Sequence, residues 1–226
     1  MADPRIAFPK TARFEGLFQN DKADNANYCN GQLIGTMRGV SAVAYKQAFG
    51  RCPTVAQIKA ITAEDAFQVF KKLFWDPMRC SEIQDQDVAN LVVDWGWGSG
   101  PITAIKKVQL VLIALGHPLV ADGKIGTRTL QALNQHPAAE LHQALYVARE
   151  AHFRAIAAAN PAKGKFLRGW LTRLASFYYS AKTVATRQLK TPGAGVLVLV
   201  LVLGVAAVLA LVFRAQLLAS LHTLAA

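Results

Sequence analysis

Apolar residues recur at intervals of three and four along much of the chain, and this spacing limits its possible folds more than any other feature. Such spacing places side chains on one side of a helix. Strand-like alternation is scarce, and only a short hairpin is expected in residues 25–40, around Asn30-Gly31. The sequence therefore predicts a mainly α fold. The apolar faces consist of Phe67, Phe70, Leu73 and Phe74; of Val88, Leu91, Val92 and Trp95; and of Ile102, Ile105, Val108 and Leu112.

Two signals set the limits of the first of these helices. Thr62-Ala63-Glu64-Asp65 has the form of a capping box, in which side chains bond the free amide groups of a helix start. Trp75-Asp76-Pro77 ends the run, because proline cannot continue a helix. A helix is predicted between these two points.

Glu15 ends a short apolar segment and is followed directly by Gly16, which is predicted to end a helix. A carboxyl on the last turn of a helix, beside aromatic residues, meets the negative end of the helix dipole and a dry environment. Both favour the protonated form that a general acid needs. Glu15 is therefore a candidate acid, although position alone favours an ordinary surface glutamate beside a turn.

The sequence around Glu15 resembles glycoside hydrolase family 108, the phage-type and bacterial N-acetylmuramidases. The family signature has an E-G-G-Y-like start, an N-D-x-x-D loop and a closing G-A-T-N-Y-G-[IV]-[TS] segment. The family's acid maps onto Glu15, whereas Leu17 and Phe18 replace the Gly-Tyr of the signature. The matching residues are Glu15 and Gly16 in the start, Asn20, Asp21 and Asp24 in the loop, and Thr36, Gly39, Val40 and Ser41 in the last part.

The resemblance continues along the chain. Residues 73–80 are similar to the family's Y-W-D-P-x-R-C segment, and residues 93–100 to its F-D-x-x-x-N-S-G segment, with Gly98 in place of the Asn. Residues 122–129 and 166–173 resemble the D-G-x-x-G-x-x-T and F-x-x-G-W-x-x-R elements of a predicted peptidoglycan-binding domain. The resemblance implies a lysozyme-like α-helical muramidase domain at residues 1–116, with a small loop or hairpin lobe. A helical peptidoglycan-binding module is expected at residues 117–181.

A muramidase needs an acid and a second group that attacks, guides water or stabilises the oxocarbenium-like state. Asp24, nine positions after Glu15, is the preferred second carboxylate, but an aspartate in such a loop often makes only turn hydrogen bonds. Thr36 is expected either to position a water or to cap the next helix. Together with Glu15, these two residues form the predicted catalytic set.

Three further residues are candidates for binding the substrate. Trp97, which is expected in a Gly-rich loop, is the best candidate for stacking on a sugar. Trp75 is a second candidate, but it also fits an apolar helical face and is then part of the core. Asp94 either binds substrate or makes a structural hydrogen bond.

Charge and cysteine content restrict the partners and cofactors. Acidic and basic residues balance in residues 1–100, so the whole net charge of +11 lies in residues 101–226. This favours anionic wall polymer or lipid headgroups, whereas no nucleic-acid-binding signature accompanies the charge. The three cysteines lack metal-ligand spacing, and reduced thiols are expected, with one bridge as the alternative. No metal and no cofactor are implied.

Residues 196–213 form an uncharged apolar run of 18 residues. As a helix this run would rise about 27 Å, close to the roughly 30 Å of a bilayer core. One transmembrane helix is predicted there, with a buried core helix as the alternative. It would follow a basic Pro/Gly linker at residues 182–195 and precede a short tail at residues 214–226. The expected location is a single-pass membrane protein, in a host inner membrane or virion membrane, without a cleavable signal peptide.

The sequence as a whole thus predicts a membrane-anchored hydrolase of the β-1,4 bonds between N-acetylmuramic acid and N-acetylglucosamine. Such an enzyme would be an endolysin or a virion-associated lytic protein. Its expected partners are peptidoglycan, a lipid membrane through residues 196–213, and holin or virion membrane proteins. One alternative is a non-catalytic peptidoglycan-binding anchor, suggested by Leu17, Phe18 and Gly98 at signature positions. The other is a lytic transglycosylase that uses the same acid.

Overall fold

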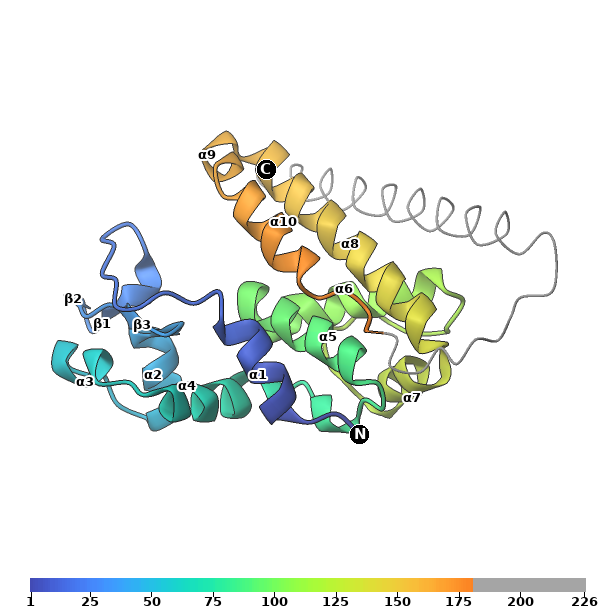
Figure 1. Ribbon diagram of the computed structural model, residues 1–226, viewed down its shortest axis with the longest axis horizontal. Helices are drawn as coiled ribbons and strands as arrows, with labels where there is room; N and C mark the ends of the chain where they lie inside the picture. Colours follow the sequence, from blue (N-terminus) through green and yellow to red (C-terminus); the bar gives the residue numbers. More distant parts are fainter. Residues whose placement is uncertain (181–226) are drawn as a thin grey trace. The chain divides into compact units, whose positions relative to one another are not determined.

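The computed structural model describes residues 1–180, which divide into one compact unit at residues 1–104 and a second that begins at Ile105 (Figure 1). The helical part of the predicted fold is confirmed. The helical elements of the first unit are α1 (Pro4–Ala12), η1 (Asn25–Asn27), α2 (Ala42–Phe49), α3 (Val55–Lys59), α4 (Ala63–Phe70), η2 (Lys71–Trp75), η3 (Cys80–Glu82) and α5 (Gln86–Ser99). Those that follow are α6 (Pro101–Ala114), α7 (Thr127–Gln135), α8 (Ala138–Ala159), α9 (Pro161–Gly164) and α10 (Leu167–Ala175).

Two short antiparallel hairpins interrupt the helices of the first unit. Strands β1 (Tyr28–Cys29) and β2 (Gln32–Leu33) form the hairpin predicted around Asn30-Gly31, and both turn residues have positive φ angles. Strands β3 (Thr36–Met37) and β4 (Val40–Ser41) form a second, unpredicted hairpin, in which Thr36 pairs with Ser41 and Met37 with Val40. This second hairpin turns at Arg38 and Gly39, again with positive φ angles.

The core of the first unit is built around α5. Residues 87–96 of this helix are all buried, as expected for a helix that neighbours cover on every side. Asp85 caps its first turn by accepting a hydrogen bond from the amide of Val88. The predicted capping box at the start of α4 is also present, with Thr62 and Asp65 bonding each other's backbone amides.

A disulfide joins Cys29 of β1 to Cys52, which lies just before α3. The two Cα atoms are 5.8 Å apart, and the residues are 23 positions apart in the sequence. The expectation of reduced thiols was therefore wrong for this pair. Cys80 is free and buried, and its burial raises the pKa of the thiol.

In the second unit, α8 is the longest helix and α10 runs beside it (Figure 1). The ring of Trp170 on α10 stacks on that of Phe153 on α8, with centroids 5.5 Å apart. The turn before α7 is held by the buried side chain of Gln109 on α6, which donates to Asp122 and accepts from the amide of Gly123. This turn is the D-G-x-x-G-x-x-T element of the sequence.

The structure corrects the predicted membrane anchor. Within residues 1–180, every helix is too short or too polar to cross a bilayer. Even the 22-residue α8 carries four charged residues that hydrocarbon would not accept, Glu140, Arg149, Glu150 and Arg154. The described residues therefore do not support the prediction of a single-pass membrane protein with one transmembrane helix. The segment on which it rested, residues 196–213, and its flanking segments lie outside the described residues.

Candidate active site

Glu15 lies just beyond the end of α1. The helix ends at Ala12, and the backbone amide of Glu15 donates to the carbonyl of Ala12 over 2.9 Å. Glu15 was predicted on the last turn of the helix, ended by a left-handed Gly16, and both details are wrong: Gly16 has no positive φ angle. The side chain of Glu15 is partly buried, and it extends from the chain that connects α1 to the hairpins.

Trp97 holds the carboxyl of Glu15. Its indole Nε1–H donates to Oε1 of Glu15 over 2.9 Å. The ring packs on Phe74 and Phe70, with centroid distances of 4.8 and 5.8 Å, respectively. Phe70 and Phe74 lie on the continuous stretch of α4 and η2, whereas Trp97 lies on α5 and not in the predicted loop. Two separate helical segments therefore fix the indole that meets Glu15.

Gly39, in the turn between β3 and β4, lies against the same carboxyl. A Cβ atom at this position would lie 2.9 Å from Oε2 of Glu15 and 2.5 Å from Cζ2 of Trp97. The backbone of Gly39 also has a φ angle of +76°, which favours glycine. A backbone hydrogen bond from Arg38 to the carbonyl of Gly16 holds the turn in place. Glu15 is thus enclosed by an indole N–H on one oxygen and bare backbone near the other.

Substituting Gly39 should therefore damage this site. We expect Gly39→Ala to lower activity at least tenfold, because the new methyl group displaces the carboxyl or the indole. The control is Gly50→Ala, at the same φ angle of +76° but with no atom within 4 Å of the methyl group that the substitution adds. Equal kinetic losses in the two variants, measured on purified peptidoglycan, would show that backbone strain and not the contact with Glu15 causes the effect.

A buried asparagine organises the loop beside this turn. Asn27 accepts a hydrogen bond from Thr36 Oγ1 over 2.6 Å and exchanges two further bonds with the side-chain amide of Gln19. Its Nδ2 also donates to the carbonyl of Asp21. Thr36 therefore fastens the loop of residues 19–27 to β3. Asn27 was not among the predicted residues. Its role depends on contacts with residues 19–21 and with β3, and a sequence motif does not show such contacts.

Asp24 lies on this loop and is exposed. Its Oδ1 accepts a hydrogen bond from the amide of Ala26 over 3.0 Å, so it caps the short helix η1. This is the turn bond that the sequence offered as the alternative to catalysis. The structure thus gives Asp24 a local bond, whereas Glu15 and Trp97 are in direct contact.

The other two predicted residues belong to the core. Asp94 is fully buried and accepts a hydrogen bond from Thr11 Oγ1 over 2.9 Å, which links α5 to α1. Trp75 is also fully buried, and its indole N–H donates to Ser81 Oγ over 2.7 Å. A ring without exposed surface has no face on which a sugar can stack. Across residues 1–180, His, Cys, Asp and Glu side chains form no group of three that could hold a metal ion.

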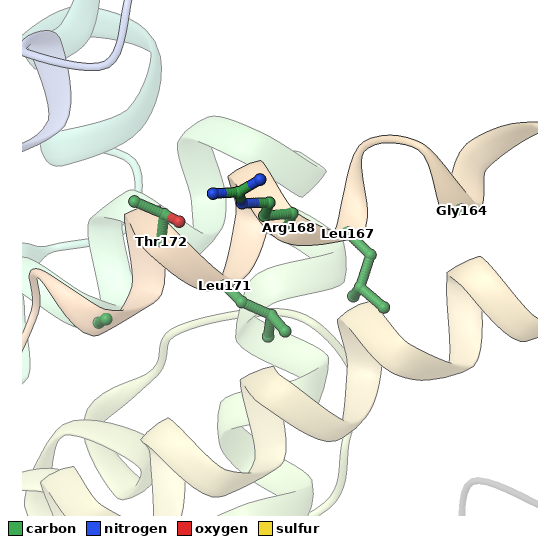
Figure 2. A pocket seen from close by; sticks show the side chains of 6 residues that line it. Gly164, Leu167, Arg168, Leu171 and Thr172 are labelled. Carbon is green, nitrogen blue, oxygen red and sulfur yellow. The ribbon is translucent and has the colours of Figure 1, made fainter.

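The second unit carries a shallow hollow of about 590 Å³ along α9 and α10 (Figure 2). Arg168 and Thr172 point away from α8, whereas Leu167 and Leu171 point toward it (Figure 2). The hollow therefore combines an apolar floor with a charged rim. The residues that line it are Gly164, Leu167, Arg168, Leu171, Thr172 and Ala175.

Comparison with known proteins gives two family matches. Residues 8–100 match the family described as Glycosyl hydrolase 108, and residues 103–175 match the one described as Predicted Peptidoglycan domain. Among solved structures, the fold is similar to that of SagA from Brucella abortus, with 23% sequence identity and a TM-score of 0.62. That match covers 77% of this chain and 90% of the SagA chain. No curated protein matches the chain.

Proposed function

We propose that this glycoside hydrolase is an N-acetylmuramidase. The chain belongs to the glycosyl hydrolase 108 family through residues 8–100 and carries a predicted peptidoglycan domain at residues 103–175. It would cleave the β-1,4 bond between N-acetylmuramic acid and N-acetylglucosamine, with Glu15 as the general acid. The observation that carries this proposal is the enclosed carboxyl of Glu15, bonded by Trp97 and packed against Gly39.

The reaction needs a proton on the leaving oxygen as the glycosidic bond breaks. In this proposal Glu15 gives its proton to that oxygen, and the bonding electron pair stays with the oxygen. Water supplies the hydroxyl group that joins the sugar carbon, and the remaining proton of this water restores the acid form of Glu15. A water-poor surrounding strengthens every electrostatic contact of the acid. The indole and aromatic rings beside Glu15 provide such a surrounding.

We assign the second catalytic role to Asp24. The loop that carries it is fastened by Asn27 to β3, the strand that leads into the turn at Gly39. Thr36 then acts through Asn27, holding the loop in register, instead of positioning a water itself. The cap on Ala26 uses Oδ1 of Asp24 and orients the carboxylate.

The biological role that we propose is lysis of the bacterial wall in phage infection, by an endolysin or a virion-associated enzyme. The support for it is the similarity of the segment around Glu15 to phage-type muramidases. Such an enzyme depends on a holin or on the virion itself to reach the wall.

Zymography of the full chain tests the enzymatic proposal. We expect a cleared zone in a gel that contains peptidoglycan, and no zone for Glu15→Gln loaded at the same amount. Wall binding without clearing by the unmodified chain would contradict the enzyme and favour a non-catalytic anchor.

For the second unit, we propose that the hollow along α9 and α10 contacts the wall polymer. From residue 151 to residue 180 the chain contains no Asp or Glu. Arg168 lines the hollow, and Lys163 and Lys165 are the sequence neighbours of Gly164, which also lines it. Phe166 is half exposed and stacks on Trp170, with centroids 6.0 Å apart. Carboxylates of the wall's peptide stems suit these cations, and the apolar faces of sugars suit the exposed ring.

Reversing one charge at the hollow should weaken wall binding. We expect Arg168→Glu to lower the affinity for purified sacculi about tenfold, the value of one lost charge-assisted contact. Co-sedimentation measures this in a Glu15→Gln background, which keeps the sacculi intact. Arg128→Glu, an exposed cation on α7, makes the same charge change elsewhere in the unit. Equal losses for the two variants would mean that net charge, and not the hollow, holds the polymer.

A further inference from the structure

Neighbouring groups pack against the indole ring of Trp97. Phe74 and Phe70 pack on it, Gly39 approaches its edge, and its only polar atom is committed to Glu15. The indole is still partly exposed, so stacking of Trp97 on a sugar stays a prediction. Its contact with Glu15 defines a further role.

The indole N–H biases which oxygen of Glu15 carries the proton. An indole nitrogen donates and never accepts, so the bonded atom, Oε1, is the acceptor. The carbonyl oxygen of a protonated carboxyl accepts more strongly than its hydroxyl oxygen, so this bond favours the form with the hydrogen on Oε2. This second oxygen lies beside Gly39, which has no side chain to fill the adjoining space.

We propose that Trp97 is a positioning residue for the acid: it directs the proton to Oε2 and stabilises the carboxylate that forms as the proton leaves. This inference rests on the proposed function of Glu15. A hydrogen bond to an ionised acceptor is roughly twice as strong as one to a neutral acceptor. The bond from Trp97 therefore strengthens as the glycosidic bond breaks, and an interaction that grows in the transition state accelerates the reaction.

Trp97→Phe tests this role, because phenylalanine keeps an aromatic ring and loses the N–H. On soluble glycan strands we expect kcat to fall about tenfold and KM to stay within about twofold. The alkaline limb of the activity profile should move about one pH unit higher, since the ionised carboxylate has lost a donor. An unchanged limb would overturn the inference.

Trp170→Phe is the matched control. It makes the same substitution on α10 in the second unit and leaves the bond between Trp97 and Glu15 in place, so its alkaline limb should stay where the unmodified enzyme has it. Charged groups lie on every element around Glu15, and all of them are present in both variants, so a shift found only in Trp97→Phe reports the lost hydrogen bond. They are Arg13 on its own segment, Arg38 on the β3–β4 turn, Glu64 and Asp65 on α4, Lys71 and Lys72 on η2, and Asp87 and Asp94 on α5.

A second measurement does not depend on the folding of Trp97→Phe. The chain has four tryptophans, and we expect one indole N–H resonance to move with pH along the alkaline limb of activity. This movement should be absent in Glu15→Gln. An indole signal that moves equally in Glu15→Gln, or none that moves in the unmodified enzyme, would contradict the inference. The proposed function fails separately, if Glu15→Gln keeps its activity.

Discussion

Glu15→Gln should lower kcat on peptidoglycan about 10³-fold, because a positioned general acid contributes on the order of 10² to 10⁴ in rate. Glutamine preserves the size of the side chain and still offers an oxygen to the indole N–H of Trp97. The fold and the wall-binding unit should therefore remain intact. The kinetic loss is then a loss of proton transfer.

Glu64→Gln provides the matched control for this experiment. Glu64 is exposed on α4 and pairs with Arg5 over 2.7 Å, so it makes an ordinary surface ion pair. Such exposed pairs contribute little to stability, because solvent screens them. We expect its activity to stay within about twofold of the unmodified enzyme. A similar loss of activity in both variants would indicate a general effect of charge. A modest loss for Glu15→Gln alone would contradict the assignment of Glu15 as the general acid.

Removal of the disulfide should have the largest effect on stability. We expect the variant with both Cys29 and Cys52 changed to Ser to lose about 3 kcal/mol of unfolding free energy. The bridge joins residues 23 positions apart, and a cross-link of this span restricts the unfolded chain. It also ties the first hairpin, next to Asn27, to the segment before α3.

Denaturant unfolding with and without reductant measures this contribution. Reductant should destabilise the unmodified chain and leave the double variant unchanged. The remaining thiol, Cys80, is buried with a raised pKa, which disfavours the thiolate that exchanges with disulfides. A reductant effect of equal size in the double variant would mean that the bridge does not stabilise the fold.

The helices could be predicted because their signals are local. The apolar faces, the capping box at Thr62 and the Asn30-Gly31 turn each depend on a few neighbouring residues. The second hairpin was missed, because its turn begins with Arg38, which has a positive φ angle that side chains disfavour. The disulfide was missed for a different reason. Which of three cysteines meet depends on how the first hairpin packs before α3, and the sequence does not show this.

The sequence predicted the residues of the site better than the contacts between them. A motif identified Glu15, and composition identified Trp97, but their hydrogen bond joins residues 82 positions apart. The packing of Phe70 and Phe74 turns the indole toward the acid, and this packing is a property of the folded unit. Trp75 and Asp94 show the converse. Each has a side chain of a type that binds substrates, but Trp75 on η2 and Asp94 on α5 are buried and belong to the core.

Mass analysis of the fragments released from purified peptidoglycan tests the central claim most directly. The unmodified chain should release glycan fragments that end in reducing N-acetylmuramic acid and have gained one water per cleaved bond. Glu15→Gln should release about 10³-fold fewer of them in the same time. Fragments that end in anhydro sugars would show a transglycosylase instead, and the same release by Glu15→Gln would contradict the assignment of Glu15 as the acid.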